Sequence, residues 1–270
     1  MKGSEIPRRS GAASTYINRR LAAGRVTFPL TDLLKETGLS TTAARNQLLR
    51  LGPRVVRVAR VHQFFVIVGS EQMSMGAPPV SWWLDDYFQW LGHPYYVALQ
   101  SAASIYGSTP QALQVTQVMT DQPRREIIVG RQRVQFFVKR GIERTLLQPL
   151  ANAYAPLQVS SPEVTAFDLV RYASRMGGLA RAVETLAPLL ALLRTSDMKH
   201  VLETEHEIST AQRLGYILEQ AGNTKLADAI YDWLPSRMAV IPLVATPIGA
   251  IKAPTIKRWQ LLNNASNFGL

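Results

Sequence analysis

The sequence predicts an α+β protein of two parts, on three observations. Residues 27–68 hold two short amphipathic helical stretches followed by two β-prone runs. Residues 1–70 contain twelve Lys and Arg against three acidic residues, so they carry +9 of the chain's net charge of +11. Residues 71–270 are nearly balanced, with eighteen basic and sixteen acidic side chains, and mix strand and helix patterns. We therefore expect a small basic N-terminal domain and a larger, mixed α/β C-terminal domain with an antiparallel sheet and helices.

The patterned stretch begins with a short amphipathic helix. Leu30, Leu33 and Leu34 recur at i, i+3 and i+4, so they share one helical face. Pro29 precedes them, and proline suits a first helical turn because the N–H that it lacks would have no intrahelical partner. Gly38 then supplies the sharp turn into the next helix.

A second helix follows, with Ser40 placed as its N-cap. Ala44, Leu48 and Leu51 lie on one face at i, i+4 and i+7. The opposite face carries polar and cationic side chains, namely Thr42, Arg45, Asn46 and Arg50. Arginine reads guanine and asparagine reads adenine in the major groove of DNA, so this helix is expected to be a recognition helix.

Two β-rich runs, residues 55–58 and 64–68, come next. The polar connection between them holds Arg60 and His62, which is typical of a hairpin, or wing. A cationic wing grips the DNA backbone beside a recognition helix. Because pattern and charge coincide here, the sequence predicts a winged helix-turn-helix DNA-binding domain over residues 1–75.

The start of the chain resembles a basic arm ahead of this domain. Residues 1–13 include Lys2, Arg8 and Arg9, and a first helix is expected over residues 14–23. A basic arm can follow a minor groove, and it can equally be a frayed terminus. Both interpretations stay open.

A linker composition marks the expected domain boundary. Residues 69–79 (GSEQMSMGAPP) are rich in Gly, Ser and Pro, so the second domain is placed at residues 80–270. The next segment is crowded with aromatic residues at helical spacing: Trp82, Trp83, Tyr87, Phe88 and Trp90. Base stacking is one interpretation, but packing between domains is favoured because buried aromatic side chains dominate cores.

The second domain is expected to begin with a helix and continue as a sheet. Residues 95–106 (YYVALQSAASIY) predict the helix. Strands are expected at residues 113–120, 126–129 and 133–139, and the last two alternate apolar and polar residues as a half-buried hairpin should.

The remainder is expected to be mostly helical. Ser161 and Pro162 form a strong helix start, with an N-cap and a proline in the first turn. Helices are expected at residues 161–176, 179–193, 210–221 and 225–234. Short β-prone pieces at residues 240–244 and 259–262 could rejoin the sheet.

A second group of basic residues surrounds the expected hairpin. Its members are Arg124, Arg125, Arg131, Arg133, Lys139, Arg140 and Arg144. They are either a solvated sheet edge, where cationic side chains discourage aggregation, or a docking surface for nucleic acid or an acidic partner. The sequence does not separate these two.

No catalytic constellation is evident. The four histidines are accompanied by no cysteine, and no P-loop, nucleophile elbow or dinucleotide fingerprint occurs. His200, Glu203, His206 and Glu207 share a helical stretch without zinc-site spacing, so they are interpreted as a solvated face. We therefore expect no enzyme activity, no cofactor and no metal.

Several stretches, in order, resemble the AbiEi family of bacterial antitoxins. The longest are YYVALQSAASIYG (95–107), QVMTDQPRREIIVGRQRVQFF (117–137) and SSPEVTAFDLVRY (160–172). Shorter ones are MGGL (176–179), RLGYILE (213–219) and WQLLNN (259–264). The resemblance spans nearly the whole chain, with the winged helix included.

The resemblance implies the antitoxin of a type IV, abortive-infection toxin-antitoxin pair. In that family the winged helix binds inverted repeats in its own promoter and represses the operon. The C-terminal antitoxin domain counteracts a cognate nucleotidyltransferase toxin, and a stable complex is not required. Carried over by position, the DNA-contacting residues are Thr42, Arg45, Asn46, Arg50, Arg57 and Arg60. Charge suggests an antitoxin surface formed by Arg124, Arg125, Arg131, Arg133 and Lys139.

Two other functions stay open at this point. One is a ligand-responsive winged-helix transcriptional regulator. The other is a nucleic-acid-modifying enzyme targeted by the helix-turn-helix, against which the missing catalytic residues argue. The sequence has no apolar run long enough for a membrane span, no signal peptide pattern and no cysteine, so we expect a cytoplasmic protein.

Overall fold

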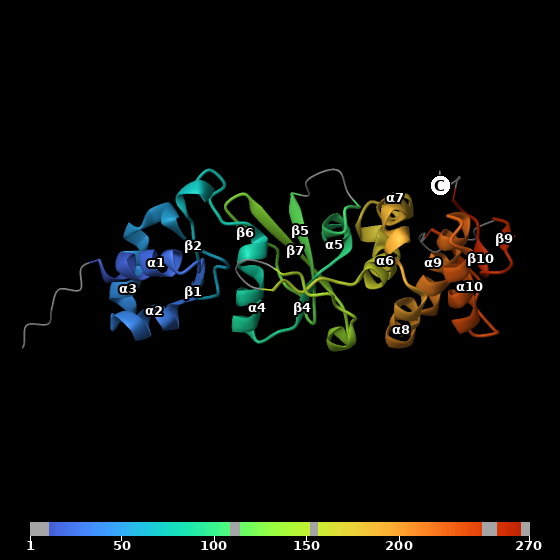
Figure 1. The fold of residues 1–270 in the computed structure, drawn as a ribbon, viewed down its shortest axis with the longest axis horizontal. Coiled ribbons are helices and arrows are strands. Elements are labelled where there is room, and N and C mark those ends of the chain that lie inside the picture. Colours follow the sequence, from blue (N-terminus) through green and yellow to red (C-terminus); the bar gives the residue numbers. More distant parts are fainter. Residues whose placement is uncertain (1–10, 109–113, 152–155, 245–252, 266–270) are drawn as a thin grey trace, which may run out of the picture.

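The computed structural model describes residues 11–108, 114–151, 156–244 and 253–265. The molecule is elongated, and the winged helix, a central sheet and a helical C-terminal end follow one another along its length (Figure 1). The predicted α+β class with an N-terminal winged helix is confirmed. Residues 1–10 of the expected basic arm lie outside the described residues.

The winged helix contains three helices and a small antiparallel sheet of strand order β1-β3-β2. Its elements are α1 (Ala12–Ala22), β1 (Thr27–Pro29), α2 (Leu30–Thr37), α3 (Thr41–Arg50), the 3-10 turn η1 (Gly52–Arg54), β2 (Val55–Arg57) and β3 (Phe64–Ile67). The predicted turn and cap have the expected geometry. Gly38 adopts a left-handed conformation with φ 61°, and the Ser40 hydroxyl accepts a hydrogen bond from the Ala43 N–H at 3.2 Å.

Strand β3 is buried on both faces. Phe65 and Ile67 pack with α1, α2 and α3 in the core of the winged helix. Phe64 and Val66 point the other way and belong to the core that continues into the second part of the molecule. The small sheet therefore joins two cores and is not a free-standing ribbon.

The central part is a four-stranded sheet of order β4-β5-β7-β6. The elements before and within it are η2 (Ser70–Gln72), η3 (Val80–Trp82), α4 (Leu84–Leu91), β4 (Tyr95–Val97), α5 (Leu99–Ile105), β5 (Val115–Thr120), β6 (Ile127–Val129), β7 (Gln132–Val138) and η4 (Ile142–Arg144). Strands β6 and β7 form the predicted hairpin. The sheet is mixed, which corrects the antiparallel sheet expected from the sequence, because β7 inserts beside β5 and runs parallel to it.

One expected helix is instead a strand followed by a helix. Residues 95–97 pair with β5 as β4, and only residues 99–105 are helical. The reason is that Tyr96 and Val97 pack into different cores, which a strand allows because successive side chains point to opposite faces.

The sheet separates the two larger cores. On one face Tyr96, Met119 and Phe137 pack with the C-terminal helices. On the other face Val118 and Val134 pack toward α4 and the winged helix. Since paired residues share a face, the register of β4, β5 and β7 dictates this division.

The C-terminal end is helical with a small terminal sheet. Its elements are α6 (Pro162–Arg171), η5 (Ala173–Arg175), α7 (Leu179–Leu186), η6 (Ala187–Leu192), α8 (Thr195–Glu205), α9 (Ile208–Gln220), α10 (Thr224–Trp233), β8 (Ile241–Pro242), β9 (Thr255–Ile256) and β10 (Leu261–Leu262). Ser161 caps α6 and Pro162 occupies its first turn, as predicted. The helix expected over residues 179–193 changes to 3-10 geometry at residue 187, where Pro188 follows and cannot donate a backbone hydrogen bond.

The terminal strands do not rejoin the central sheet, which corrects that expectation. They form their own sheet of order β8-β10-β9. Trp259, just before β10, is fully buried against α9. A Cβ on Gly215 of α9 would lie 2.1 Å from the Trp259 ring, so only glycine admits this contact. Two stretches that resemble the AbiEi family, at residues 213–219 and 259–264, therefore pack together.

The expected boundary between the two domains at residues 76–79 stays a prediction. In the structure this segment packs closely on the β6–β7 turn. The Arg131 N–H donates to the Met75 carbonyl at 2.8 Å, and the Trp83 indole N–H donates to the Pro78 carbonyl at 3.3 Å. Among the described residues, no helix is both long and apolar enough to cross a membrane.

Candidate nucleic-acid interface

Helix α3 presents a continuous exposed stripe. All four side chains predicted on its polar face, Thr42, Arg45, Asn46 and Arg50, are exposed. Ala44 and Leu48 on the opposite face are buried against α1 and α2. The helix sequence TTAARNQLLR contains no acidic residue. The arrangement leaves both arginines free to contact phosphates or guanine edges.

The wing places two further predicted cations beside α3. Arg57 is exposed at the end of β2, and Arg60 is exposed in the turn between β2 and β3. One guanidinium nitrogen of Arg57 donates to the Arg60 carbonyl at 3.0 Å, and its carbon lies 5.5 Å from the centre of the Phe65 ring. Arg57 is therefore held in a fixed position, whereas Arg60 extends from the wing tip.

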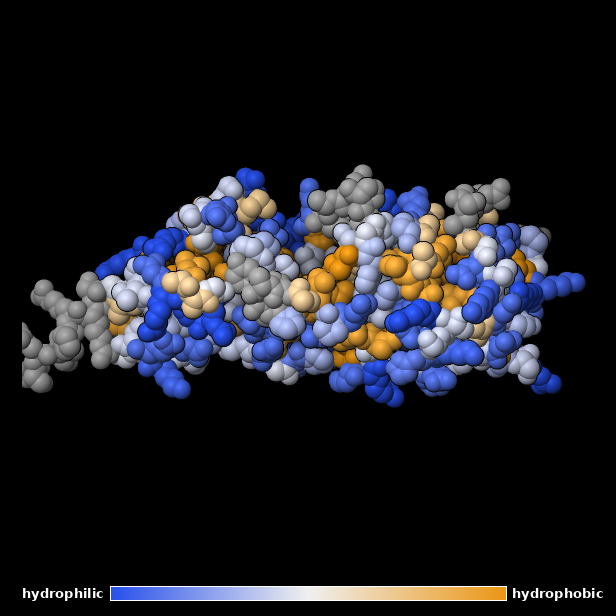
Figure 2. Space-filling view, viewed as in Figure 1, coloured by the Kyte–Doolittle hydropathy of each residue, from blue (hydrophilic) through white to orange (hydrophobic). Residues whose placement is uncertain are grey.

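A groove runs between α3 and the wing. Its lining residues are Arg45, Asn46, Leu48, Leu49, Gly52, Val55, Arg57 and Phe65. The groove has cationic and amide groups around a partly apolar floor. In the view of Figure 2, hydrophilic residues predominate over the N-terminal part, while larger apolar areas show over the C-terminal helices.

Leu49 also lines this groove, although it was not among the residues predicted from the sequence. Its side chain is 80% exposed, although it lies between Asn46 and Arg50 on the stripe. The signal was present in the helical spacing, because Leu49 is out of phase with the buried Ala44 and Leu48.

The base of the wing docks onto α4. The Nδ1 atom of His62 lies 2.6 Å from the Tyr87 hydroxyl, and Phe64 packs against both Tyr87 and Trp90. The Thr27 hydroxyl also donates to Asp86 of α4. These contacts confirm that the aromatic residues of α4 pack between the two parts. Burial, and secondarily the charge of Arg124, lowers the pKa of His62 below its ordinary value.

The expected antitoxin surface is only partly exposed. Arg125 and Arg131 face solvent. Arg133 is paired with Glu126 at 2.9 Å, and the half-buried Arg124 lies over the Phe88 ring at 5.3 Å. The prediction that Lys139 belongs to this surface is wrong, because its side chain is 1% exposed and lies in the interior.

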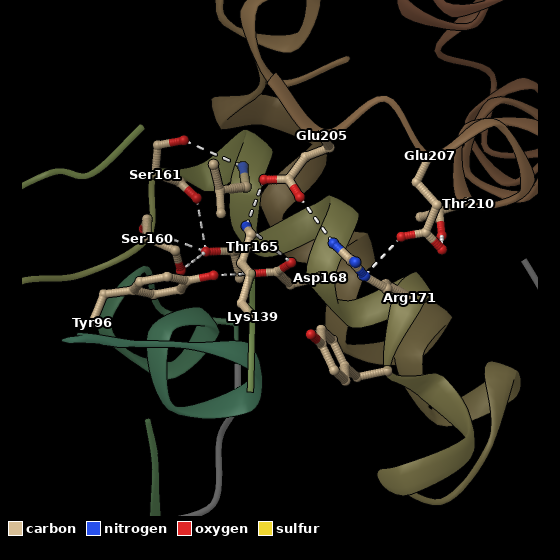
Figure 3. Close-up of polar contacts among 12 residues, drawn as sticks. Tyr96, Lys139, Ser160, Ser161, Thr165, Asp168, Arg171, Glu205, Glu207 and Thr210 are labelled. Carbon is tan, nitrogen blue, oxygen red and sulfur yellow. Dashed lines mark hydrogen bonds and ion pairs between the residues drawn. The ribbon is translucent and has the colours of Figure 1, made fainter. Parts of the chain in front are cut away.

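Lys139 is part of a buried ion-pair cluster between the sheet and the C-terminal helices (Figure 3). Its Nζ atom lies 2.6 Å from Glu205 and 3.5 Å from Asp168. Arg171 of α6 contacts the other oxygen of Glu205 at 2.9 Å and Glu207 at 2.7 Å. Glu207 is therefore ion-paired and only partly exposed, whereas His200, Glu203 and His206, of the same predicted solvated face, are exposed.

The cluster also includes a tyrosine from the sheet. The Tyr96 hydroxyl donates to Asp168 at 2.7 Å. Burial, reinforced by the negative charge of Asp168, raises the pKa of Tyr96 well above its ordinary value, so the hydroxyl stays protonated and remains a donor. Removing one partner of such a buried pair leaves an uncompensated charge, so the cluster fixes how the sheet and helices meet.

The same cluster contains no metal site. Among the described residues, no group of three or more His, Asp or Glu side chains is arranged to hold a metal ion. The carboxylates of Asp168 and Glu205 are instead occupied by Lys139, Arg171 and Tyr96.

Comparison with known proteins finds a match to a family model and a similarity to a solved structure. The model of the AbiEi antitoxin C-terminal domain family matches residues 95–220. The crystal structure of the RV2827C protein from Mycobacterium tuberculosis is similar with a TM-score of 0.64 and 19% sequence identity, over 94% of this chain and 91% of that chain. At this identity the likeness shows the fold. No curated protein matches the sequence.

Proposed function

We propose, from the match of residues 95–220 to the AbiEi antitoxin C-terminal domain family, that the chain is a non-enzymatic antitoxin that also represses its own operon. The winged helix binds inverted repeats in the promoter. The C-terminal domain counteracts a nucleotidyltransferase toxin without requiring a stable complex. DNA is thus the direct partner of the first part, and the toxin is the functional partner of the second.

The exposed stripe of α3 supports DNA binding most directly. Its arginines and asparagine are free of acidic neighbours within the helix and are oriented away from the core. Residues 1–70 carry a net +9, which favours phosphate contacts through counterion release. An Arg–Asn–Arg face beside a cationic wing matches the chemistry of major-groove readout.

The docking of the wing supports an approach of DNA from the side of α3. The base of the wing is closed by α4 through His62 and Phe64, whereas Arg60 at its tip and the α3 stripe remain exposed. A duplex whose major groove holds α3 would therefore contact the wing tip with its neighbouring backbone. The body lies on the opposite side of the small sheet and leaves this approach open.

Family membership supports the antitoxin activity. The matched residues run from β4 to the end of α9 and include the whole run from Tyr96 to Glu207 that forms the buried cluster. We assign the surface that acts against the toxin to Arg125 and Arg131, the two members of the expected patch that stay exposed and lack a charged partner among the described contacts.

A footprint on the DNA upstream of the chain's own gene tests the first activity. The variant Arg45→Ala with Asn46→Ala is expected to lose about tenfold or more in affinity for the protected site, because each bidentate base contact contributes about 1–3 kcal/mol. The matched control is Arg125→Ala with Arg131→Ala, which removes exposed charge from the body. Protection that is equal for the two variants would contradict α3 as the reader.

The same two variants test the second activity in cells that express the neighbouring toxin gene. Arg45→Ala with Asn46→Ala is expected to rescue growth as the wild type does when expressed from an unrelated promoter. Arg125→Ala with Arg131→Ala is expected to rescue poorly while still repressing the operon. If both variants rescue fully, the antitoxin surface lies elsewhere on the domain.

A ligand-responsive regulator is the second candidate, favoured by a small cavity between α4, the sheet and α5. Apolar side chains and hydroxyl groups line it, including Leu84, Val97, Ser101, Ser104 and Thr116. A metabolite that raises the melting temperature of the full chain and weakens operator binding would support this candidate.

A further inference from the structure

The exposed stripe of α3 includes one apolar side chain. Leu49 is 80% exposed, and among the described residues it is flanked on α3 by Arg45, Asn46 and Arg50. A single exposed leucine on a protein surface is ordinary. Here the side chain lies on an otherwise polar, cationic face near the C-terminal end of α3, one helical turn from Arg45, and it lines the groove between α3 and the wing.

From this position we propose that Leu49 is a specificity-determining residue that reads the 5-methyl group of a thymine in the operator. The inference rests on the proposed function and deepens it. Thymine is the base that presents an apolar group in the major groove, and apolar side chains discriminate it by contact with that methyl. In the free protein and the free DNA both apolar groups are exposed to water. The contact removes both of them from water, which is favourable.

The chemistry of the neighbours favours duplex DNA over a protein partner. Arg45 and Arg57 line the same groove as Leu49, Arg50 follows it on α3, and the helix has no acidic residue. An apolar protein surface would have to leave these charges unpaired or bury them at a cost. A DNA groove supplies phosphates for the cations and a methyl group for the leucine at the same time.

The helix geometry predicts where the thymine lies. Leu49 follows Asn46 by three residues and Arg45 by four, which is about 4.5–6 Å along a helix axis. Base pairs are stacked about 3.4 Å apart. A helix that lies in the groove therefore places the methyl group in the same half-site as the adenine or guanine that Asn46 and Arg45 contact, on a neighbouring base pair.

Replacement of thymine by deoxyuridine tests this contact, because it removes only the methyl group. The footprinted operator is prepared with each thymine changed in turn, and binding of the full chain is titrated in gel-shift assays. We expect one position in each half-site at which wild-type affinity falls about fourfold, the value for one buried methyl group. Leu49→Ala is expected to bind the unmodified operator with a similar loss and to show no further loss at that position.

Ile128 provides the matched control. It is a 60% exposed aliphatic residue on β6 of the body, so Ile128→Ala removes comparable apolar surface away from the groove. This variant is expected to bind like the wild type and to keep the sensitivity to deoxyuridine.

Three results would overturn the inference. Wild-type affinity that is unchanged by every deoxyuridine substitution would exclude methyl readout. Leu49→Ala that keeps full sensitivity to the substitution would assign the methyl contact to another residue. Loss of self-association in Leu49→Ala, measured by sedimentation without DNA, would assign the exposed side chain to a contact between copies of the chain. Failure of the wild type to bind any operator would instead contradict the proposed function.

Discussion

The basic side chains of the two parts of this molecule lie in opposite environments. In the winged helix, Arg45, Arg50 and Arg60 extend into solvent. In the body, Lys139 and Arg171 are held against carboxylates at 2.6–2.9 Å. The net charges of +9 for residues 1–70 and +2 for residues 71–270 follow this division. The three arginines of the winged helix thus have no ion-pair partner among the described residues, whereas these two cations of the body join the sheet to the C-terminal helices.

The largest effect is expected from loss of the buried ion pairs of Lys139. Lys139→Ala leaves Glu205 and Asp168 buried without their cation and is expected to lower the free energy of unfolding by about 3–5 kcal/mol. Urea denaturation followed by circular dichroism measures it. Lys199→Ala, at an exposed site on α8, is the control and is expected to stay within about 0.5 kcal/mol of the wild type. Equal effects of the two substitutions would mean that the buried pairing contributes no stability.

A smaller effect is expected where Trp259 packs on Gly215 of α9. Gly215→Ala places a Cβ 2.1 Å from the Trp259 ring and is expected to cost about 1–3 kcal/mol of unfolding free energy, the usual range for overpacked cores. Gln220→Ala, on the exposed end of the same helix, is the control. An unchanged melting temperature for Gly215→Ala would show that β10 and α9 separate easily.

Two exposed arginines, one in each part, test whether the exposed charge of the winged helix contacts DNA. Arg60 lies at the wing tip, and Arg131 lies on the body, and both face solvent. Arg60→Ala is expected to reduce the slope of log affinity against log salt concentration by about 1, because one phosphate contact is lost. Arg131→Ala is expected to leave the slope unchanged. A reduced slope for Arg131→Ala would extend the DNA-binding surface onto the body.

The smallest effect concerns His62, where the two parts meet. Burial lowers its pKa below the ordinary value, so the unfolded chain binds more protons there than the folded protein. The stability attached to neutral His62 is therefore present above about pH 6.5 and is lost as the pH falls through the folded-state pKa.

Unfolding at pH 5.5 and pH 7.5 is expected to show a slightly larger loss for the wild type than for His62→Gln. The exposed His200→Gln is the control and is expected to behave as the wild type. An identical pH dependence for all three proteins would show that His62 contributes nothing to the junction.

The exposed face of α3 was predictable because the information for it is local. The spacing of Ala44 and Leu48 identifies the buried face, and the exposed positions of Arg45 and Asn46 follow from the same period of 3.6 residues. Leu49 was not predicted at the groove because only polar side chains were expected on the exposed face of α3 and only apolar ones on its buried face. The spacing itself placed it correctly.

The burial of Lys139 was not predictable from its neighbours in the sequence. It follows a strand among several exposed arginines, so composition suggested a surface. Its partners Asp168 and Glu205 come from helices later in the chain. The parallel pairing of β5 and β7 directs Lys139 toward them, and local alternation of residues gives no information on strand order.

The sequence by itself determined the local elements of this protein: the helix pair and wing of residues 27–68, the cap at Ser161 and the concentration of positive charge at the N-terminus. These depend on residue spacing, capping chemistry and composition, which act over a few residues. Tertiary structure alone decided that β7 lies beside β5, that Lys139 is enclosed and that Trp259 packs on Gly215. Each of these joins distant segments, and their pairing is settled by which surfaces exclude water together when the whole chain folds.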